Sequence, residues 1–254
     1  MHNLIVVGYG GGVNSTAMLI ECYRRGVKVD LISFADTGGE RPETYSYVIG
    51  FSMWLVSVGY PPITIVRKNR RDGSIETLED ECIRRNSLPS LAYGFKTCSQ
   101  KFKIQPQDKF CNNWPKSKDH WEAGGKVTKF IGFDADESHR IKPYSDKKYD
   151  VEYPLVKWDM GREECVESVV NACLPVPPKS ACFFCPSSKP AEVRRLAATH
   201  PELADRAVKM EKNADLTKIK GLGRSYAWSN LIATTDMFHE EYLNTIDNCG
   251  CYDG

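Results

Sequence analysis

The cysteines of this chain are its first candidates for metal binding or catalysis. The sequence contains ten, and five of them stand where metal binding is plausible on spacing: Cys98, Cys182, Cys185, Cys249 and Cys251. Two residues separate Cys182 from Cys185, so both thiolates can bind one metal ion or cluster. Four of these five thiolates would complete one tetrahedral set. Spacing alone does not choose between zinc and an iron–sulfur cluster.

Cys98 has a sequence context that favours the thiolate form. It precedes a predicted helix that carries Lys101 and Lys103. A helix N-terminus and nearby cations both lower the pKa of a thiol. Cys98 is therefore a candidate metal ligand or nucleophile, and a buried structural cysteine is the alternative.

A glycine-rich loop near the N-terminus is a second candidate site. Residues 4–7 are apolar and predict a buried strand, and residues 17–23 have a helical pattern. Glycines let a backbone approach a ligand, and unpaired N–H groups at a helix start attract anions such as phosphate. The segment matches neither a Walker A loop nor GxGxxG, and a turn without a ligand is the alternative. Its candidate residues are Gly10, Gly11, Gly12, Asn14, Ser15 and Thr16.

The elements around this loop predict a parallel sheet. Strands are expected at 27–35, 63–66 and 129–133, with a helix at 43–58 between the first two. Strand, helix and strand in this order form a βαβ unit, and ligands of such sheets lie at the carboxyl ends of the strands. The residues expected there are Asp36, Thr37, Gly38, Arg67, Asp134, Asp136, Glu137 and Arg140.

The chain is therefore expected to have a doubly wound α/β fold. Residues 1–150 would form the nucleotide-binding domain. Residues 151–254 would form a smaller helical region that carries the CxxC motif and the terminal cysteines.

Composition limits the partners and the compartment. The chain has 34 Lys and Arg residues and 33 Asp and Glu residues. Its net charge therefore does not favour binding to nucleic acid, although a local basic patch could still bind one. No apolar run reaches the roughly 20 residues that span a bilayer, and no signal peptide is recognisable. We expect a cytoplasmic protein with reduced or metal-bound cysteines.

Together these motifs resemble the phosphoadenosine phosphosulfate (PAPS) reductase-like branch of the PP-loop, or N-type ATP pyrophosphatase, superfamily. The resemblance is greatest to the phage-type and DNA-phosphorothioation-type members, and it covers nearly the whole chain. The segments that carry it are 10–15, 36–44, 98–103, 132–140 (which begins with Gly132) and 182–185. The chain departs from the family loop at Gly10, where the family has serine, and at Asn14, where it has aspartate. Asn14 cannot supply a charge to a Mg²⁺ ion that accompanies the nucleotide.

The resemblance implies a fold of the adenine nucleotide alpha hydrolase type that binds ATP or PAPS. It also implies a [4Fe–4S] cluster on Cys98, Cys182, Cys185 and one of Cys249 or Cys251, with the remaining terminal cysteine as nucleophile or persulfide carrier; zinc is the alternative metal. The cations expected to neutralise phosphate or sulfate are Arg67, Lys68, Lys101, Lys103 and Arg140.

Three functions follow from the resemblance. One is an oxidoreductase that releases sulfite from PAPS or adenylyl sulfate. Another is a sulfurtransferase that cleaves ATP to pyrophosphate and thiolates a nucleic acid or a small molecule. The third is a catalytically inactive nucleotide-binding partner protein. A sulfur or electron donor protein is an expected partner of the first two, and a homo-oligomer remains open.

Overall fold

A five-stranded sheet forms the centre of the fold. The computed structural model describes residues 3–89, 91–92, 95–141 and 144–234. All paired strands of the sheet are parallel, in the order β3-β2-β1-β6-β7. Their bounds are Leu4–Tyr9 (β1), Leu31–Ala35 (β2), Ile63–Val66 (β3), Val127–Phe130 (β6) and Tyr149–Glu152 (β7). The predicted α/β class with a parallel sheet is confirmed.

The order of the strands reverses at β1. The chain runs from β1 to β2 and β3 on one side, and then returns to the other side of β1 with β6. Val7 therefore pairs with Ile32 of β2 and with Phe130 of β6. In open α/β sheets, such a switch point leaves a crevice outside the carboxyl ends of the two diverging strands, where ligands bind.

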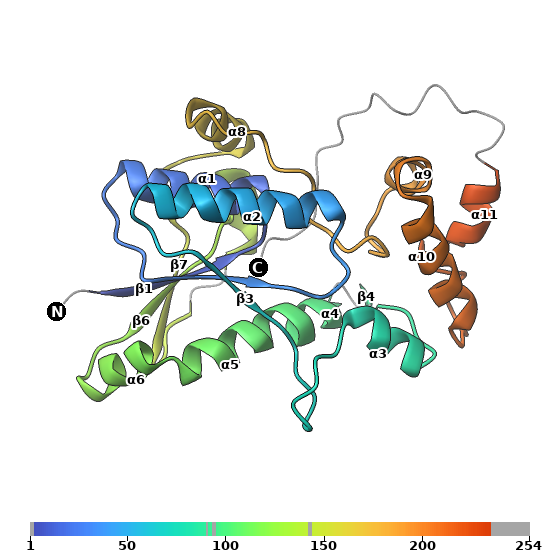
Figure 1. Ribbon diagram of the computed structural model, residues 1–254, viewed down its shortest axis with the longest axis horizontal. Coiled ribbons are helices and arrows are strands. Elements are labelled where there is room, and N and C mark those ends of the chain that lie inside the picture. The colour runs from blue at the N-terminus through green and yellow to red at the C-terminus, as the bar shows by residue number, and fades with distance from the viewer. Residues whose placement is uncertain (1–2, 90, 93–94, 142–143, 235–254) are drawn as a thin grey trace.

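Helices cover both faces of the sheet, as Figure 1 shows. Helices α1 (Val13–Arg24) and α2 (Pro42–Ser57) lie on one face, and α8 (Arg162–Asn171) packs on α1. Helices α5 (Gln105–Asn113) and α6 (Pro115–Glu122) lie on the other.

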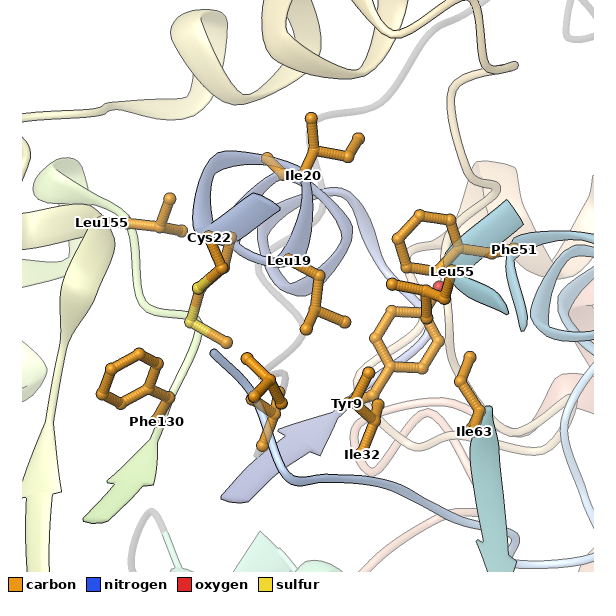
Figure 2. Packing of buried hydrophobic residues seen from close by; sticks show 14 of the residues in the cluster. Tyr9, Leu19, Ile20, Cys22, Ile32, Phe51, Leu55, Ile63, Phe130 and Leu155 are labelled. Atoms are coloured by element: carbon orange, nitrogen blue, oxygen red, sulfur yellow. The ribbon is translucent and has the colours of Figure 1, made fainter. Parts of the chain in front are cut away.

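Alternation along β1 explains the two layers. Ile5 and Val7 belong to the core beneath α1 and α2, whereas Leu4 and Val6 belong to the core beneath α5 and α6. Successive side chains of a strand point to opposite faces, so an uninterrupted apolar run can support helices on both. Figure 2 shows the first core, in which Leu19 of α1 and Phe51 of α2 converge on the sheet.

A second core lies at the carboxyl edge of the sheet. Phe183 and Phe184 are fully buried in it, with an edge-to-face contact of 4.7 Å between ring centroids. Its helices are α3 (Leu78–Arg84), α9 (Pro190–Thr199), α10 (Pro201–Asn213) and α11 (Trp228–Ala233). The remaining elements are short: β4 (Leu91–Ala92), β5 (Phe95–Lys96), α4 (Thr97–Ser99), the π-helix η1 (Gln100–Ile104), the 3₁₀ helix η2 (Ala135–Arg140) and α7 (Pro154–Lys157).

Two strands differ in their bounds from the sequence prediction, and one strand was not predicted. The strand predicted at 27–35 begins only at Leu31. Before it, the Asp30 N–H donates to the Ile5 carbonyl at 2.9 Å, and the Asp30 carboxylate, not its backbone, accepts from the Ile5 N–H at 3.0 Å. The strand predicted at 129–133 spans 127–130. The edge strand β7 was not anticipated.

The division of the chain near residue 150 remains a prediction. Leu155, Met160 and Cys165 pack in the same core as α1, so the segment after β7 continues the first layer. Within the described part of the chain, no helix is both long and apolar enough to cross a membrane.

Candidate functional site

The glycine loop lies at the carboxyl edge of the sheet, directly after β1. Gly11 has a φ of +80°, a conformation that L side chains rarely adopt. The Gly10 N–H donates to Ser15 Oγ at 3.2 Å, and Thr16 Oγ1 donates to the Gly12 carbonyl at 2.8 Å. These two hydroxyl groups therefore stabilise the loop itself. Among the described residues, no side chain caps α1 at Gly12, so its first-turn N–H groups can receive an anion.

Asn14 links this loop to the loop after β6. Its side chain is buried, and its Nδ2 donates to Asp134 Oδ2 at 2.8 Å. Its Oδ1 accepts from Arg162 Nη1 at 2.9 Å. A Cβ added to Gly132 would lie 3.0 Å from the Ser15 Cα, so the two loops are in direct contact. The structure thus brings the first and third predicted motifs together at the switch point.

The acidic residues after β6 mainly order their own loop. Asp134 Oδ1 accepts from the Glu137 N–H at 3.0 Å and caps η2, and Asp136 Oδ2 accepts from the Arg162 N–H at 2.9 Å. Arg140 forms an ion pair with Glu137, and its guanidinium lies 4.0 Å from the centre of the Phe133 ring.

Asp36, at the end of β2, is buried, and its carboxylate accepts several hydrogen bonds. Its Oδ1 accepts from the Gly38 N–H at 2.8 Å and from Tyr45 Oη at 2.7 Å. Its Oδ2 accepts from Arg67 Nε at 2.8 Å. Burial and the Asp36 carboxylate raise the pKa of Tyr45, so its hydroxyl remains a donor. A cavity of about 270 Å³ opens beside these residues, lined also by Thr77.

The predicted phosphate-binding cations all have carboxylate partners. These pairs are Arg67 with Asp36, Lys68 with Glu76 and Glu81, Lys101 with Glu81, Lys103 with Glu40, and Arg140 with Glu137. Sequence reasoning missed Glu40, Glu76 and Glu81, because no motif or spacing relates them to the cations. A bound phosphate would therefore meet cations whose charge is already partly offset.

Glu76 makes this network sensitive to acid. Hydrogen bonds from Lys68, with further ones from Arg84 and Arg70, outweigh burial and lower the pKa of Glu76 to about 2. An unfolded glutamate titrates near about 4.3. Because the folded-state pKa is the lower one, the stability that Glu76 contributes is present above about pH 4.3 and is lost as the pH falls toward 2.

We expect Glu76→Gln to flatten this acid dependence. Denaturant unfolding at a series of pH values should show that the free energy of unfolding falls less steeply below about pH 4.3 in the variant than in the wild type. Glu122→Gln, at an exposed position of α6, is the control and should follow the wild-type curve. Equal slopes for all three proteins would contradict the assignment.

The CxxC pair lies against the loop after β2. Cys182 Sγ is 3.1 Å from Thr37 Oγ1, and residue 182 opposes Glu40 in an antiparallel bridge. The Cys185 N–H donates to the Cys182 carbonyl at 3.0 Å, which closes a tight turn. Burial raises the pKa of the Cys182 thiol to about 12, and the charge of Glu40 adds to this shift.

Cys98 and Cys182 are both partly buried against the second core. Among the described residues, no three His, Cys, Asp or Glu side chains are already arranged to hold a metal ion. Cys249 and Cys251, the candidates for the fourth ligand, lie outside the described residues. The structure thus places Cys98 and Cys182 against the same core, with Cys185 in the turn that follows Cys182, and the predicted metal centre itself is not shown.

A larger cavity of about 1170 Å³ is lined by Val13, directly after the glycine loop. The starts of α1 and α2 line it together with α8 and α9. Arg162, which bonds Asn14, and Arg41, whose buried Nε has no hydrogen-bond partner among the described residues, are two of its basic residues. His200 also lines it and lies 2.6 Å from Glu43. Sequence reasoning did not identify this cavity.

Comparisons with known proteins add no family to this description. A scan against protein-family models finds no match, and a search of curated proteins finds none either.

Proposed function

We propose that the chain binds an adenine nucleotide at the glycine loop and uses it in sulfur chemistry, as a PAPS reductase-like enzyme. The observation that carries the proposal is the contact of Asn14 with Asp134, because it joins two motifs far apart in the sequence at the switch point. That crevice is where sheets of this topology bind nucleotides.

In this proposal the phosphates and the nucleoside of the nucleotide bind at different parts of the site. The N–H groups at the start of α1 would receive phosphates. The cavity beside Asp36, Gly38 and Arg67 would hold part of the nucleoside, where polar groups can fix its orientation. Lys101, Lys103 and Arg140 lie in ion pairs, so a nucleotide would share them with Glu81, Glu40 and Glu137.

The cysteines near the second core have the donor chemistry of a thiolate-bound metal centre. Cys98, Cys182 and Cys185 would supply three ligands, and Cys249 or Cys251 the fourth. An iron–sulfur cluster bound there would supply or accept electrons; zinc would only stabilise this region. Because the Cys182 thiol has a raised pKa, metal binding must release its proton, so uptake is favoured at higher pH.

Sulfur transfer is a second candidate function, and the larger cavity favours it. Its lining residue Arg162 donates directly to Asn14 of the glycine loop. A second substrate in this cavity would therefore lie next to the nucleotide phosphates. Reductive release of sulfite requires no organic acceptor, whereas thiolation of a nucleic acid or a small molecule does.

We expect nucleotide turnover by an anaerobically prepared sample whose iron and zinc contents are measured first. Incubation with PAPS should release sulfite if the chain is a reductase, and incubation with ATP should release pyrophosphate if it is a sulfurtransferase. Asn14→Ala should weaken nucleotide binding by about ten- to a hundredfold in calorimetry, since it removes hydrogen bonds to a carboxylate and a guanidinium that align the loop.

Asn113→Ala, at an exposed position of α5, is the matched control and should bind as the wild type does. Binding without either product would support the inactive partner protein. Absence of both binding and products in a metal-loaded sample would refute the proposal.

A further inference from the structure

Beyond Glu43 in its first turn, helix α2 has no charged residue. The sequence has no Asp, Glu, Lys, Arg or His from Thr44 to Val66, although 26% of the chain is charged. Ile49, Met53 and Val56 are nevertheless 63%, 66% and 53% exposed. A surface helix normally presents polar side chains to solvent, and a contiguous apolar patch marks an interaction surface.

Four of the exposed residues of α2 follow a coiled-coil spacing. Ser46, Ile49, Met53 and Val56 are all exposed and recur at intervals of three and four residues, the a and d positions of a heptad. We call these four residues the α2 seam. The helix buries Val48, Phe51 and Leu55 against the sheet. It therefore has two apolar faces, of which the chain's own core uses one.

Two further exposed apolar side chains belong to segments that contact α2. Tyr23 of α1 is 45% exposed, and its ring lies 5.9 Å from that of Trp54. Val176 is 44% exposed and follows Pro175, whose carbonyl accepts from Tyr47 Oη at 2.9 Å. Figure 1 shows α1 and α2 side by side on one face of the sheet. A stable interface buries about 800 Å² per partner, more than one helix supplies, so these flanking residues matter.

We propose that the α2 seam binds the α2 seam of a second copy of this chain, in an antiparallel pair across a twofold axis. In such an isologous interface each patch faces itself, so a charged seam would repel its copy and an uncharged seam does not. In the antiparallel arrangement Ile49 faces Met53 of the second copy, and Ser46 faces Val56. Both pairs are centred on position 51, near the middle of the helix spanning 42–57.

Two features of the backbone favour this arrangement. The antiparallel arrangement sets the N-terminus of each helix opposite the C-terminus of the other, which aligns their dipoles favourably. Gly50 lies beside the seam, and a Cβ added there would meet no atom within 4 Å. The surface at Gly50 is thus open to a side chain of the second copy.

Sedimentation velocity tests the proposal. The wild-type chain, of 28.7 kDa, should sediment with twice that mass at micromolar concentration. Met53→Lys should weaken the dimer at least about a hundredfold, because it buries an unpaired charge in the centre of the interface. Ile83→Lys is the control: Ile83 is 46% exposed on α3, and this variant should remain dimeric.

Mixing two variants tests the register. Ile49→Glu alone should also be monomeric. Mixed with Met53→Lys, it should form a heterodimer, because position 49 of one chain faces position 53 of the other and opposite charges then meet. A monomeric wild type, including one that floats with lipid vesicles, would overturn the proposal. So would dissociation of the Ile83→Lys control or failure of the mixture to dimerise. If Met53→Lys does not fold, Val56→Lys paired with Ser46→Glu makes the same test.

Discussion

Glu211→Ala should lower the free energy of unfolding by about 3–4 kcal/mol, among the largest losses expected from one side chain of this protein. The Glu211 carboxylate is buried and accepts from the N–H groups of Leu222, Trp228 and Ser229 at 2.7–3.1 Å. It also accepts from Ser229 Oγ at 2.9 Å. The alanine variant leaves these donors buried without an acceptor, and each unsatisfied donor carries a desolvation cost.

Denaturant unfolding measures this loss, with two comparison variants. Glu211→Gln keeps one acceptor oxygen and should cost less than the alanine variant. Glu202→Ala removes a carboxylate that is 65% exposed on the same helix, and it should change stability by no more than about 0.5 kcal/mol. Similar losses for Glu202→Ala and Glu211→Ala would contradict the stabilising role of the buried carboxylate.

Gly38→Ala should destabilise the fold by about 3 kcal/mol or more, from two separate causes. Gly38 has a φ of +75°, where an L side chain is strained. In addition, an added Cβ would lie 2.4 Å from Thr77 Cγ2 and 2.7 Å from Thr77 Cβ. Thr77 caps α3 and cannot move freely, because its Oγ1 accepts from the Asp80 N–H at 3.0 Å.

Gly26→Ala separates the two causes. Gly26 has a similar φ of +66°, but a Cβ there would meet nothing within 4 Å. It should therefore show only the backbone strain, about 1 kcal/mol. The excess loss in Gly38→Ala, measured by chemical denaturation, reports the clash with Thr77. Equal losses at both positions would mean that α3 shifts without cost, and the cavity beside Asp36 would then be more adaptable than its hydrogen bonds suggest.

The elements at the sheet were predictable because their signals are local. Apolar runs identify β1 and β2, and Pro42 and Pro190 stand at the starts of α2 and α9 as expected of first-turn prolines. The sequence also predicted that Asp36 and the glycine loop lie at the same edge of the sheet, because parallel strands end on the same side. Strand β7 escaped prediction because its sequence, Tyr-Asp-Val-Glu, is short and half charged.

The charge pairing at the site could not be predicted. Glu76 meets Lys68 across the turn that the Asn69–Ile75 bridge closes, and Glu81 of α3 reaches the same lysine. Glu40 meets Lys103 of the π-helix that follows Cys98. No periodicity in the sequence encodes such contacts. Arg67 and Lys68 follow β3 and Lys101 and Lys103 lie in η1, but their carboxylate partners, which decide how much charge a ligand meets, could not be predicted.

The contacts that complete the glycine loop also place it late in the order of folding. Asn14 meets Asp134 across 120 residues of sequence and Arg162 across 148, and Ser180 Oγ donates to the Gly10 carbonyl across 170. Contacts between such distant residues form slowly, because a long loop must close first. On the ribosome, β1 and α1 emerge early, yet the loop between them must wait until residue 180 has been synthesised. The part of the chain made first is therefore among the last to reach its native contacts.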